Sequence, residues 1–225
     1  MTLLKVQLNG ARRTFKAEAT PDLAEAIRAS VAANSESDLV DRAMKAGDYA
    51  PGFRLPDRQT KAFDLNDHLA RGPVVVSFYG GDWCPFCALE LEALSEAHAE
   101  ISALGASLVA VSPHPATRPA EPSPTDLLPF PLLIDAGAKT ARKYGVAFRL
   151  SEPLRLLYAA MDLPPAADGL LPVPATYVID QSGRIALSYI DQDFTTRLEP
   201  ADIVVALRRL RERPHKSRSR TPEEQ

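Results

Sequence analysis

Short apolar runs alternate with longer amphipathic stretches along most of the chain. The runs are rich in valine, isoleucine and tyrosine, which is typical of β-strands, and they cover residues 74–79, 107–112, 132–135, 175–180 and 184–190. Several are apolar almost throughout, which indicates strands buried on both faces. The segment Asp180-Gln181-Ser182-Gly183 is typical of a hairpin turn, so the last two strands are predicted to be antiparallel. The pattern therefore predicts an α/β fold with a central mixed β-sheet flanked by helices on both faces.

Helical patterns lie between and after these strands. Apolar residues recur at three- and four-residue spacing over residues 86–104, 138–144, 153–161 and 200–211. Residues 47–212 are therefore predicted to form the main domain.

The two ends of the chain have different patterns. Residues 1–46 are predicted to form a mainly helical extension, with helices over 23–31 and 39–46. Asn9-Gly10 leaves a small hairpin open as an alternative near the start. Residues 213–225 contain proline, serine and charged residues, and we predict a disordered tail there.

Composition adds little about partners but narrows the class of protein. The 225 residues carry a net charge of −3 and are 45% hydrophobic, which is enough to build a core. Residues 1–8 do not resemble a signal peptide and no later run is long enough to span a bilayer, so we expect a cytoplasmic protein. Neither a nucleic acid nor a membrane is an expected partner.

The only two cysteines, Cys84 and Cys87, follow the first predicted strand of the main domain and begin its first helix. Pro85 suits the first helical position, which makes Cys84 the residue that caps the helix. The free N–H groups at a helix start favour a thiolate, although a helix end alone shifts a thiol pKa by less than one unit. A larger lowering of the Cys84 pKa would require hydrogen bonds from backbone amides or from the Cys87 thiol.

The helical pattern separates the roles of the two sulfurs. Its apolar face contains Cys87, Leu91, Leu94, His98 and Ile101, so Cys87 is predicted to be buried. Cys84 is predicted to lie at the mouth of the helix, where a substrate can approach. We therefore expect Cys84 to be the nucleophile and Cys87 the resolving thiol.

Two other uses of the cysteine pair are less favoured. A zinc site needs four ligands, and the spacing of His68, His98, His114 and His215 does not complete one, so no metal or cofactor is expected. A purely structural disulfide would close a loop too short to stabilise the fold much.

An ordered set of motifs over residues 47–191 resembles the alkyl hydroperoxide reductase and thiol-specific antioxidant (AhpC/TSA) family, that is, peroxiredoxin-like proteins with a thioredoxin-like fold. The motifs are Gly47-Asp48-Tyr49-Ala50-Pro51-Gly52-Phe53-Arg54-Leu55, Val74 to Tyr79 with Trp83-Cys84-Pro85-Phe86-Cys87, Leu132-Leu133-Ile134-Asp135 with Lys143-Tyr144-Gly145-Val146, and Val173-Pro174-Ala175-Thr176-Tyr177-Val178-Ile179-Asp180. The resemblance implies that the first motif forms a strand and that the last motif faces the cysteines.

The chain departs from that resemblance at two positions. Typical peroxiredoxins have a threonine or serine where this chain has Gly81, and an arginine near the position of Pro174. Pro174 instead resembles the proline of thioredoxins, which is usually cis and presents backbone groups to substrate. Asp82, next to the motif, is expected to oppose thiolate formation. Gly81, Trp83 and Pro174 are the candidate substrate-binding residues.

Other residues are weaker candidates. His114 could approach Cys84, Arg149 could replace the missing arginine, and His98 is expected to be a core histidine. Trp83 and Tyr79 are expected to pack around the sulfurs. The apolar residues of segment 151–172 are expected either to pack in the core, to cover the site or to join two subunits, and they are Leu154, Leu157, Tyr158 and Met161.

The resemblance implies a thiol-dependent peroxidase, an antioxidant oxidoreductase in which Cys84 attacks a hydroperoxide and becomes a sulfenic acid that Cys87 resolves as a disulfide. An external thiol reductant such as a thioredoxin or glutaredoxin system would recharge the pair, and a homodimer is one expected assembly. Two alternatives stay open: a thiol-disulfide oxidoreductase acting on protein disulfides, and a redox-sensing binding protein without turnover.

Overall fold

The structure, a computed structural model, describes residues 3–35, 38–114, 127–160 and 169–212. Its centre is a sheet of five strands in the order β5-β4-β3-β8-β9. Strands β3, β4 and β5 run parallel, whereas β8 is antiparallel to both β3 and β9. The predicted mixed sheet is confirmed, with strand bounds β3 Val74–Phe78, β4 Ser107–Ser112, β5 Leu132–Ile134, β8 Ala175–Ile179 and β9 Ile185–Ile190.

The hairpin between β8 and β9 forms as predicted. The Gly183 N–H donates to the Asp180 carbonyl at 2.9 Å, and the Asp180 N–H donates to the Arg184 carbonyl at 2.8 Å. Gly183 has a φ of +84°, a conformation that glycine adopts without strain.

The middle strand β3 is buried on both faces, because helices cover each side of the sheet. Val75 joins one apolar cluster with residues of the helices below it. Val74, Val76 and Phe78 join a second cluster on the opposite face. This alternation follows from the two-residue period of a strand, and it explains why the run in the sequence is apolar throughout.

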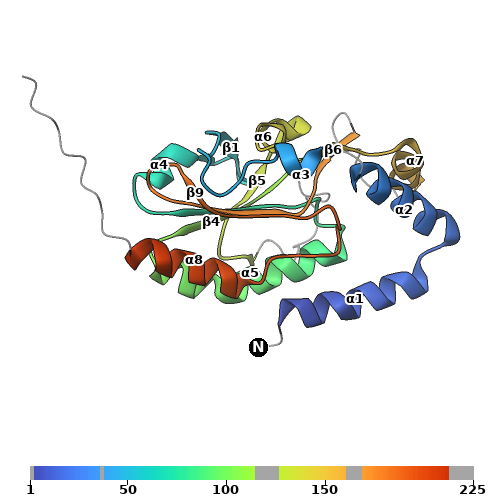
Figure 1. Cartoon of the computed structure of the whole chain (residues 1–225), viewed down its shortest axis with the longest axis horizontal. Coiled ribbons are helices and arrows are strands. Elements are labelled where there is room, and N and C mark those ends of the chain that lie inside the picture. The colour runs from blue at the N-terminus through green and yellow to red at the C-terminus, as the bar shows by residue number, and fades with distance from the viewer. Residues whose placement is uncertain (1–2, 36–37, 115–126, 161–168, 213–225) are drawn as a thin grey trace, which may run out of the picture.

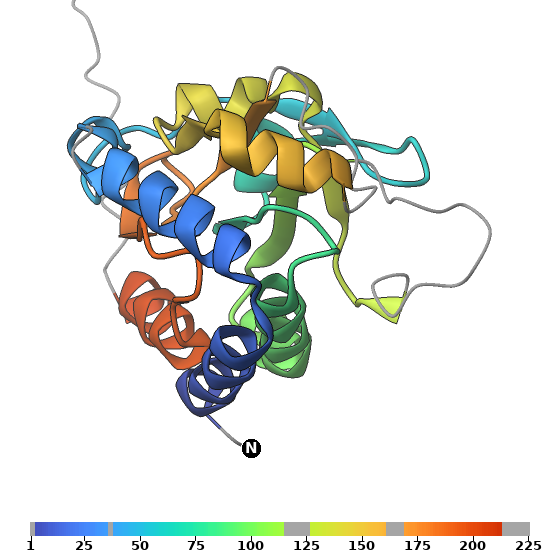
Figure 2. The same ribbon diagram turned by 90° about the vertical axis from the view of Figure 1, so that its right-hand side faces the viewer.

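Two layers of helices enclose the sheet (Figure 1). One face is covered by α1 Leu4–Glu18, α5 Pro85–Ala103 and α8 Pro200–Glu212. Over the other face lie shorter elements: α3 Leu39–Arg42, β1 Arg54–Pro56, β2 Ala62–Asp64, α4 Leu65–Leu69, the 3₁₀ turn η2 Ala136–Ala138 and α6 Lys139–Lys143. The N-terminal helix α2 Pro21–Ser35 crosses one end of the molecule beside α7 Glu152–Ala160 (Figure 2). A small ladder, β6 Ala147–Arg149 with β7 Leu170–Pro172, lies at the same end.

The hairpin alternative near the start of the chain is wrong. Asn9 and Gly10 lie inside the continuous helix α1, because Leu4 and Leu8 sit one helical turn apart and are both buried. The N-terminus of α1 is held by a distant carboxylate: the Leu4 and Lys5 N–H groups donate to Glu199 at 3.2 Å and 2.6 Å. That contact satisfies N–H groups that have no partner within a helix.

Two further boundaries differ from the predictions. The helix expected over 39–46 ends at Arg42, because Ala43 is extended and the Met44 N–H donates to the Tyr144 carbonyl at 3.0 Å. The strand expected over 47–55 begins only at Arg54. Before it, the chain follows the start of β9, where the Gly47 N–H donates to the Ile185 carbonyl at 2.8 Å.

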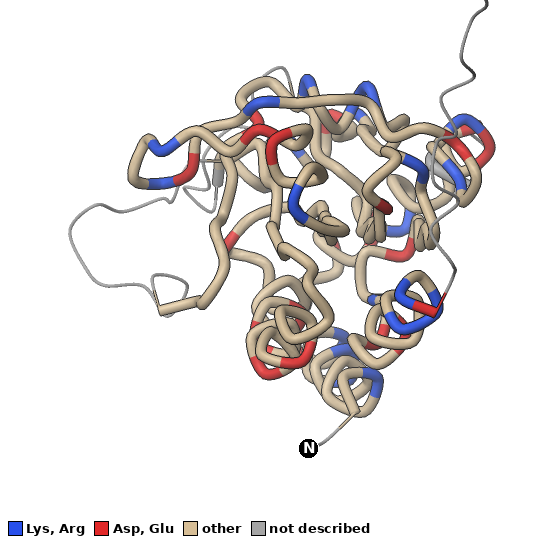
Figure 3. Tube along the Cα trace, turned by 90° about the vertical axis from the view of Figure 1, so that its left-hand side faces the viewer, with Lys and Arg blue, Asp and Glu red and all other residues tan. Residues whose placement is uncertain are grey.

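Charged residues of both signs are interspersed along the trace (Figure 3). One exposed pair, Arg208 with Glu100 at 2.6 Å, links α8 to α5. In the part of the chain that the structure describes, no helix is long and apolar enough to cross a membrane.

Candidate active site

The two cysteines lie where β3 turns into α5. Cys84 is the N-cap of α5 and Pro85 occupies its first turn, as predicted. The turn is closed by the Cys84 N–H, which donates to the Gly81 carbonyl at 3.2 Å. A proline at this position removes an N–H group that the helix could not have paired. The chain therefore places both sulfurs at one end of a helix that packs under the sheet.

Cys84 is not exposed, and this part of the prediction is wrong. Cys84 is 5% exposed and Cys87 is 2% exposed. Phe15 of α1 packs against Phe86, with 5.8 Å between the ring centroids, and α2 lines the same cavity as both sulfurs. Both thiols are free, and they hydrogen-bond to each other.

A buried arginine contacts the inner sulfur. Arg197, in the segment between β9 and α8, places Nη2 3.0 Å from the Cys87 Sγ. Its Nε donates to Glu90 on α5, and Glu90 accepts a second hydrogen bond from the Ser77 hydroxyl of β3 at 2.7 Å. The Arg197 Nη1 donates to the carbonyls of Phe194 and Thr196 at 2.8 Å and 2.6 Å. These contacts fix the guanidinium in place and satisfy a charge that would be costly to bury alone.

This arrangement favours negative charge on Cys87. Although burial opposes ionisation, the hydrogen bond from the Cys84 thiol and the charge of Arg197 lower the pKa of Cys87 to about 7. The hydrogen bond to Cys87 and burial raise the pKa of Cys84. At Cys84 the hydrogen bond and burial oppose the effect of the helix start on the thiol pKa. Because the two thiols share a hydrogen bond, they lose their protons as a coupled pair.

Gly81 is required by its own geometry. Its φ is +151°, and a Cβ at this position would lie 2.4 Å from Trp83 Nε1. A threonine or serine at position 81 would displace the indole ring. Trp83 in turn packs edge-on against Tyr158 of α7 at 4.8 Å between ring centroids.

Asp82 is neutralised by neighbours other than the cysteines. It forms an ion pair with Arg58 and accepts a hydrogen bond from the Tyr79 hydroxyl at 3.2 Å. The expected opposition of Asp82 to thiolate formation stays a prediction.

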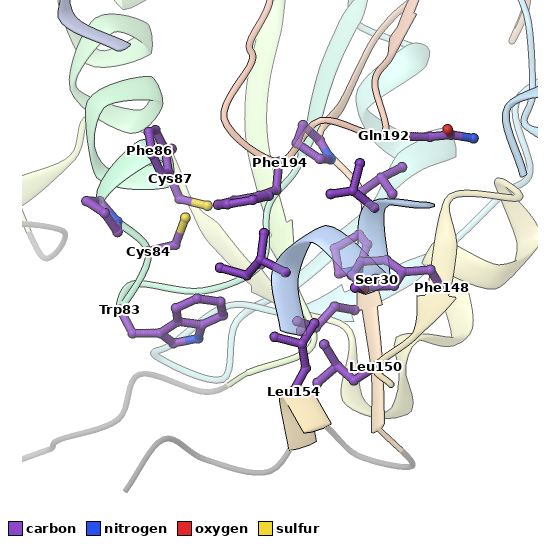
Figure 4. A pocket seen from close by; sticks show the side chains of 18 of the residues that line it. Ser30, Trp83, Cys84, Phe86, Cys87, Phe148, Leu150, Leu154, Gln192 and Phe194 are labelled. Carbon is purple, nitrogen blue, oxygen red and sulfur yellow. The ribbon is translucent and has the colours of Figure 1, made fainter. Parts of the chain in front are cut away.

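Both sulfurs line a cavity of about 170 Å³. Its wall is almost entirely apolar, and its side chains come from segments distant in sequence (Figure 4). Phe15 of α1, Ile27 of α2 and Leu154 of α7 are among its lining residues. Arg197 is its only charged lining residue among those described.

The predicted substrate-binding residues fall into two groups. Trp83 and Pro174 line the cavity, whereas Gly81 does not and its neighbour Gly80 does. Every peptide bond in the described residues is trans, so the cis geometry expected for Pro174 is wrong. The Pro174 carbonyl instead accepts the Asp191 N–H at 3.1 Å, which extends the pairing of β8 with β9.

The weaker candidates take ordinary structural places. Tyr79 is buried in the cluster that contains both cysteines, as predicted, but His98 is partly exposed and bonds Ser102 at 3.3 Å. Neither His114 nor Arg149 is a lining residue of the cavity, and burial lowers the pKa of His114.

Segment 151–172 contributes to the site only through its described part. Leu154 and Tyr158 line the cavity, which agrees with a covering role. The side chains of Leu157 and Met161, and the tail 213–225, lie outside the described residues.

Sequence reasoning missed Arg197, Glu90 and Ser77. One signal was present: Glu90 follows Cys87 by three positions, which puts a carboxylate on the buried face of the helix. A carboxylate there requires a buried partner, although the pattern could not identify Arg197, 107 positions away.

Known proteins resemble this chain in sequence and in fold. The family model described as AhpC/TSA matches residues 46–188. The chain belongs to the AhpC/TSA family. A protein named putative peroxiredoxin Q, chloroplastic, from Oryza sativa subsp. indica is 29% identical over 181 residues, which cover 80% of this chain and 74% of that protein. A putative peroxiredoxin of Mycobacterium tuberculosis is 27% identical over 168 residues, with 75% and 99% covered.

The solved structures show the same fold. The crystal structure of Peroxidoxin BcpB from Mycobacterium tuberculosis is similar to this AhpC/TSA protein with a TM-score of 0.58 and 26% identity, over 74% of this chain and 98% of the other. The AhpC/TSA match begins after α1 and α2 and ends before Arg197. The helices that wall the cavity from the N-terminal side, and the arginine on Cys87, therefore come from outside the matched region.

Proposed function

We propose that this protein is a thiol-dependent peroxidase that reduces hydroperoxides with the Cys84 and Cys87 pair. The observation that carries the proposal is the guanidinium of Arg197 3.0 Å from Cys87 Sγ, inside an apolar cavity that also contains Cys84. A fixed positive charge stabilises the thiolate, and it stabilises the negative charge that develops on oxygen when an O–O bond breaks.

The proposed reaction begins at Cys84, which occupies the position of the reactive cysteine in the family that the chain resembles. The Cys87 thiolate accepts the Cys84 proton through their shared hydrogen bond, and the Cys84 sulfur attacks the terminal oxygen of the hydroperoxide. The O–O bond breaks, Cys84 becomes a sulfenic acid, and the alkoxide takes the proton and leaves as an alcohol.

Cys87 then completes the cycle. It attacks the Cys84 sulfenic sulfur as a thiolate, the S–O bond breaks as a disulfide forms, and the oxygen leaves as hydroxide, which takes a proton from solvent to become water. An external dithiol, such as a reduced thioredoxin or glutaredoxin, transfers two electrons to the disulfide and restores both thiols. A homodimer and a cytoplasmic location stay predictions.

The reverse order is favoured by one observation, the lowered pKa of Cys87. In that order Cys87 attacks first and Cys84 resolves. Burial of both sulfurs hinders any folded partner chain, so it does not separate the peroxidase from the second function considered, oxidoreduction of protein disulfides.

The deciding experiment follows the fluorescence of Trp83, the only tryptophan, after rapid mixing of the reduced protein with hydrogen peroxide. We expect a reaction faster than that of free cysteine, loss of it in Cys84→Ser, and an accumulated sulfenic acid in Cys87→Ser, detected by mass spectrometry. A reaction lost in Cys87→Ser but kept in Cys84→Ser would reverse the order. A rate equal to that of free cysteine, with rapid reduction of insulin disulfides, would replace the peroxidase function.

A further inference from the structure

A second cavity, of about 450 Å³, lies beside the hairpin that β1 and β2 form. Its walls come from residues 57–59 and 61–63 of the hairpin, His68 of α4 and residues 128–132 at the entry to β5. Among the described residues, none lines both this cavity and the one that contains the sulfurs. An apolar cavity of about 150 Å³ holds benzene, so the second cavity has room for a molecule of two fused rings.

Several walls of this second cavity are flat and apolar. The imidazole of His68 stacks on Phe63, with 3.8 Å between the ring centroids and 19° between the ring planes. The His68 ring is also fixed by a hydrogen bond of 3.1 Å between its Nδ1 and the Ser107 hydroxyl. Residues 129–131, two prolines around a phenylalanine, add further rings to the lining. Such surfaces favour a planar aromatic ligand.

The lining of the second cavity includes one cation without a partner among the described residues. Arg58 forms an ion pair with Asp82. The Asp57 carboxylate accepts hydrogen bonds from the Gln59 and Lys61 N–H groups at 2.9 Å and 2.8 Å. The Lys61 ammonium forms no hydrogen bond or ion pair with any residue that the structure describes, and Lys61 is exposed. An acidic ligand would supply the missing negative charge.

His68 adds a flat surface but no charge. Burial lowers the pKa of its imidazole, and the positive charges of Arg71 and Lys61 lower it further, although Asp67 and Asp64 act in the opposite direction. The ring is therefore neutral at pH 7. Lys61 and Arg58 remain the cations of the lining.

We propose that the second cavity binds a small planar aromatic acid, of about two fused rings with one acidic group. The rings lie against His68 and residues 129–131, and the acidic group meets the Lys61 ammonium. Because an exposed ion pair contributes little, the apolar contacts supply most of the affinity and the charge supplies the preference for an acid. This site goes beyond the proposed peroxidase function and does not depend on it.

The test titrates 2-naphthoate into the reduced, isotope-labelled full-length protein and follows the amide chemical shifts by NMR. We expect saturable shifts at residues 57–63 and at His68, with a dissociation constant of about 1 mM or tighter, which is usual for a molecule of that size. 2-Naphthamide has nearly the same shape without the charge, and it should bind about three- to fivefold more weakly.

Two variants separate the charge from the ring. Lys61→Met should weaken the binding of 2-naphthoate by about three- to fivefold and leave that of 2-naphthamide unchanged. His68→Ala removes the stacked ring and should weaken the binding of both probes by about two- to tenfold. Lys143→Met is the matched control, since it replaces an exposed lysine of α6 that lines neither cavity, and it should bind both probes like the wild type.

Three results would overturn the proposal. The first is the lack of saturable shifts below about 10 mM 2-naphthoate. The second is a set of shifts confined to the residues that line the cavity beside the cysteines. The third is equal affinity for the two probes in the wild type, together with equal affinity of Lys61→Met and Lys143→Met for 2-naphthoate. All three leave the peroxidase proposal standing, because that proposal is tested by the reaction of the thiols.

Discussion

At the scale of single residues, the chemistry of the site depends on which groups touch the sulfurs. The positions of Cys84 at the helix cap and Cys87 on the buried helix face could be predicted, because capping and helical periodicity are local properties of sequence. The charge on each sulfur could not be predicted from the sequence. It depends on Arg197, which reaches Cys87 from 110 positions away.

Replacing Arg197 should change the pH dependence of the reaction. In the wild type the pKa of Cys87 is lowered to about 7, so the rate with peroxide should rise from pH 6 to 8 and then level. Arg197→Met removes the positive charge and should move that rise to higher pH, as measured by stopped flow and by thiolate absorbance. Arg197→Lys keeps a positive charge, so its pH profile should lie between those of the wild type and Arg197→Met. Arg208→Met, which replaces an exposed arginine of α8, should leave the pH profile unchanged. An unmoved profile in Arg197→Met would contradict the role of the guanidinium.

The ionisation of Cys87 should also make the free energy of unfolding depend on pH. Because the folded-state pKa of Cys87 lies below the ordinary value of 9.0, its ionisation stabilises the reduced fold above that value and the contribution is lost as pH falls toward about 7. Urea unfolding of the reduced protein from pH 6 to 9 measures this contribution as the difference between the wild type and Cys87→Ser.

Gly81 offers a second prediction at this scale. Gly81→Thr forces a side chain into a positive φ and against the Trp83 indole, which should destabilise the fold by about 1 to 3 kcal/mol. Gly80→Ala is the matched control, since a Cβ there meets the same ring at an ordinary 3.5 Å. Urea unfolding measures the change in stability, and the emission maximum of Trp83 reports the displacement of its indole ring. Equal stability of the two variants would mean that the turn tolerates a side chain at position 81.

At the scale of elements, the N-terminal helices add a wall to the cavity at the mouth of α5. The sheet strands were predictable because buried strands are apolar throughout, and their pairing follows from the hairpin and the helical crossovers. The place of α1 and α2 in the fold was not predictable, because amphipathic periodicity identifies a helix without identifying what its apolar face covers. Cys84 was therefore predicted to be accessible, and it is buried.

The packing of α1 can be tested through its buried leucines. Leu8 is 4% exposed and lies in the cluster that contains both cysteines, so Leu8→Ala should lower the free energy of unfolding by about 2 to 5 kcal/mol. Val6→Ala, at a position 55% exposed on the same helix, should change it by less than about 0.5 kcal/mol. Denaturant titration followed by circular dichroism compares them. A small effect of Leu8→Ala would show that α1 contributes little to the folded core.

At the scale of the whole molecule, one buried polar network joins distant segments. Ser77 on β3, Glu90 on α5 and Arg197 before α8 meet beneath the sheet, and the side chains of Arg197 and Glu90 are only 2% and 3% exposed. The contacts of Glu90 therefore hold the fold together and also position Arg197 beside Cys87. Replacing Glu90 should change both the stability and the site.

Removing Glu90 should be far more destabilising than removing an exposed partner. Glu90→Ala leaves the Arg197 charge buried without its carboxylate, which costs about 3 to 5 kcal/mol. Glu100→Ala breaks the Arg208 pair, whose side chains are 51% and 59% exposed, and should cost less than about 1 kcal/mol. A double-mutant cycle with Arg197→Met measures the coupling by urea unfolding. Additive effects of Glu90→Ala and Arg197→Met would contradict a shared network.

The burial of both sulfurs also sets a condition on turnover. A protein reductant attacks a disulfide only by bringing its own sulfur to within bonding distance, and neither Cys84 nor Cys87 offers more than 5% of its surface. A small peroxide can reach the sulfurs through the cavity, whereas recharging by a large partner requires the residues that bury the sulfurs to move. The time between catalytic cycles would then be governed by how often the molecule opens, and small thiols would be spared that wait.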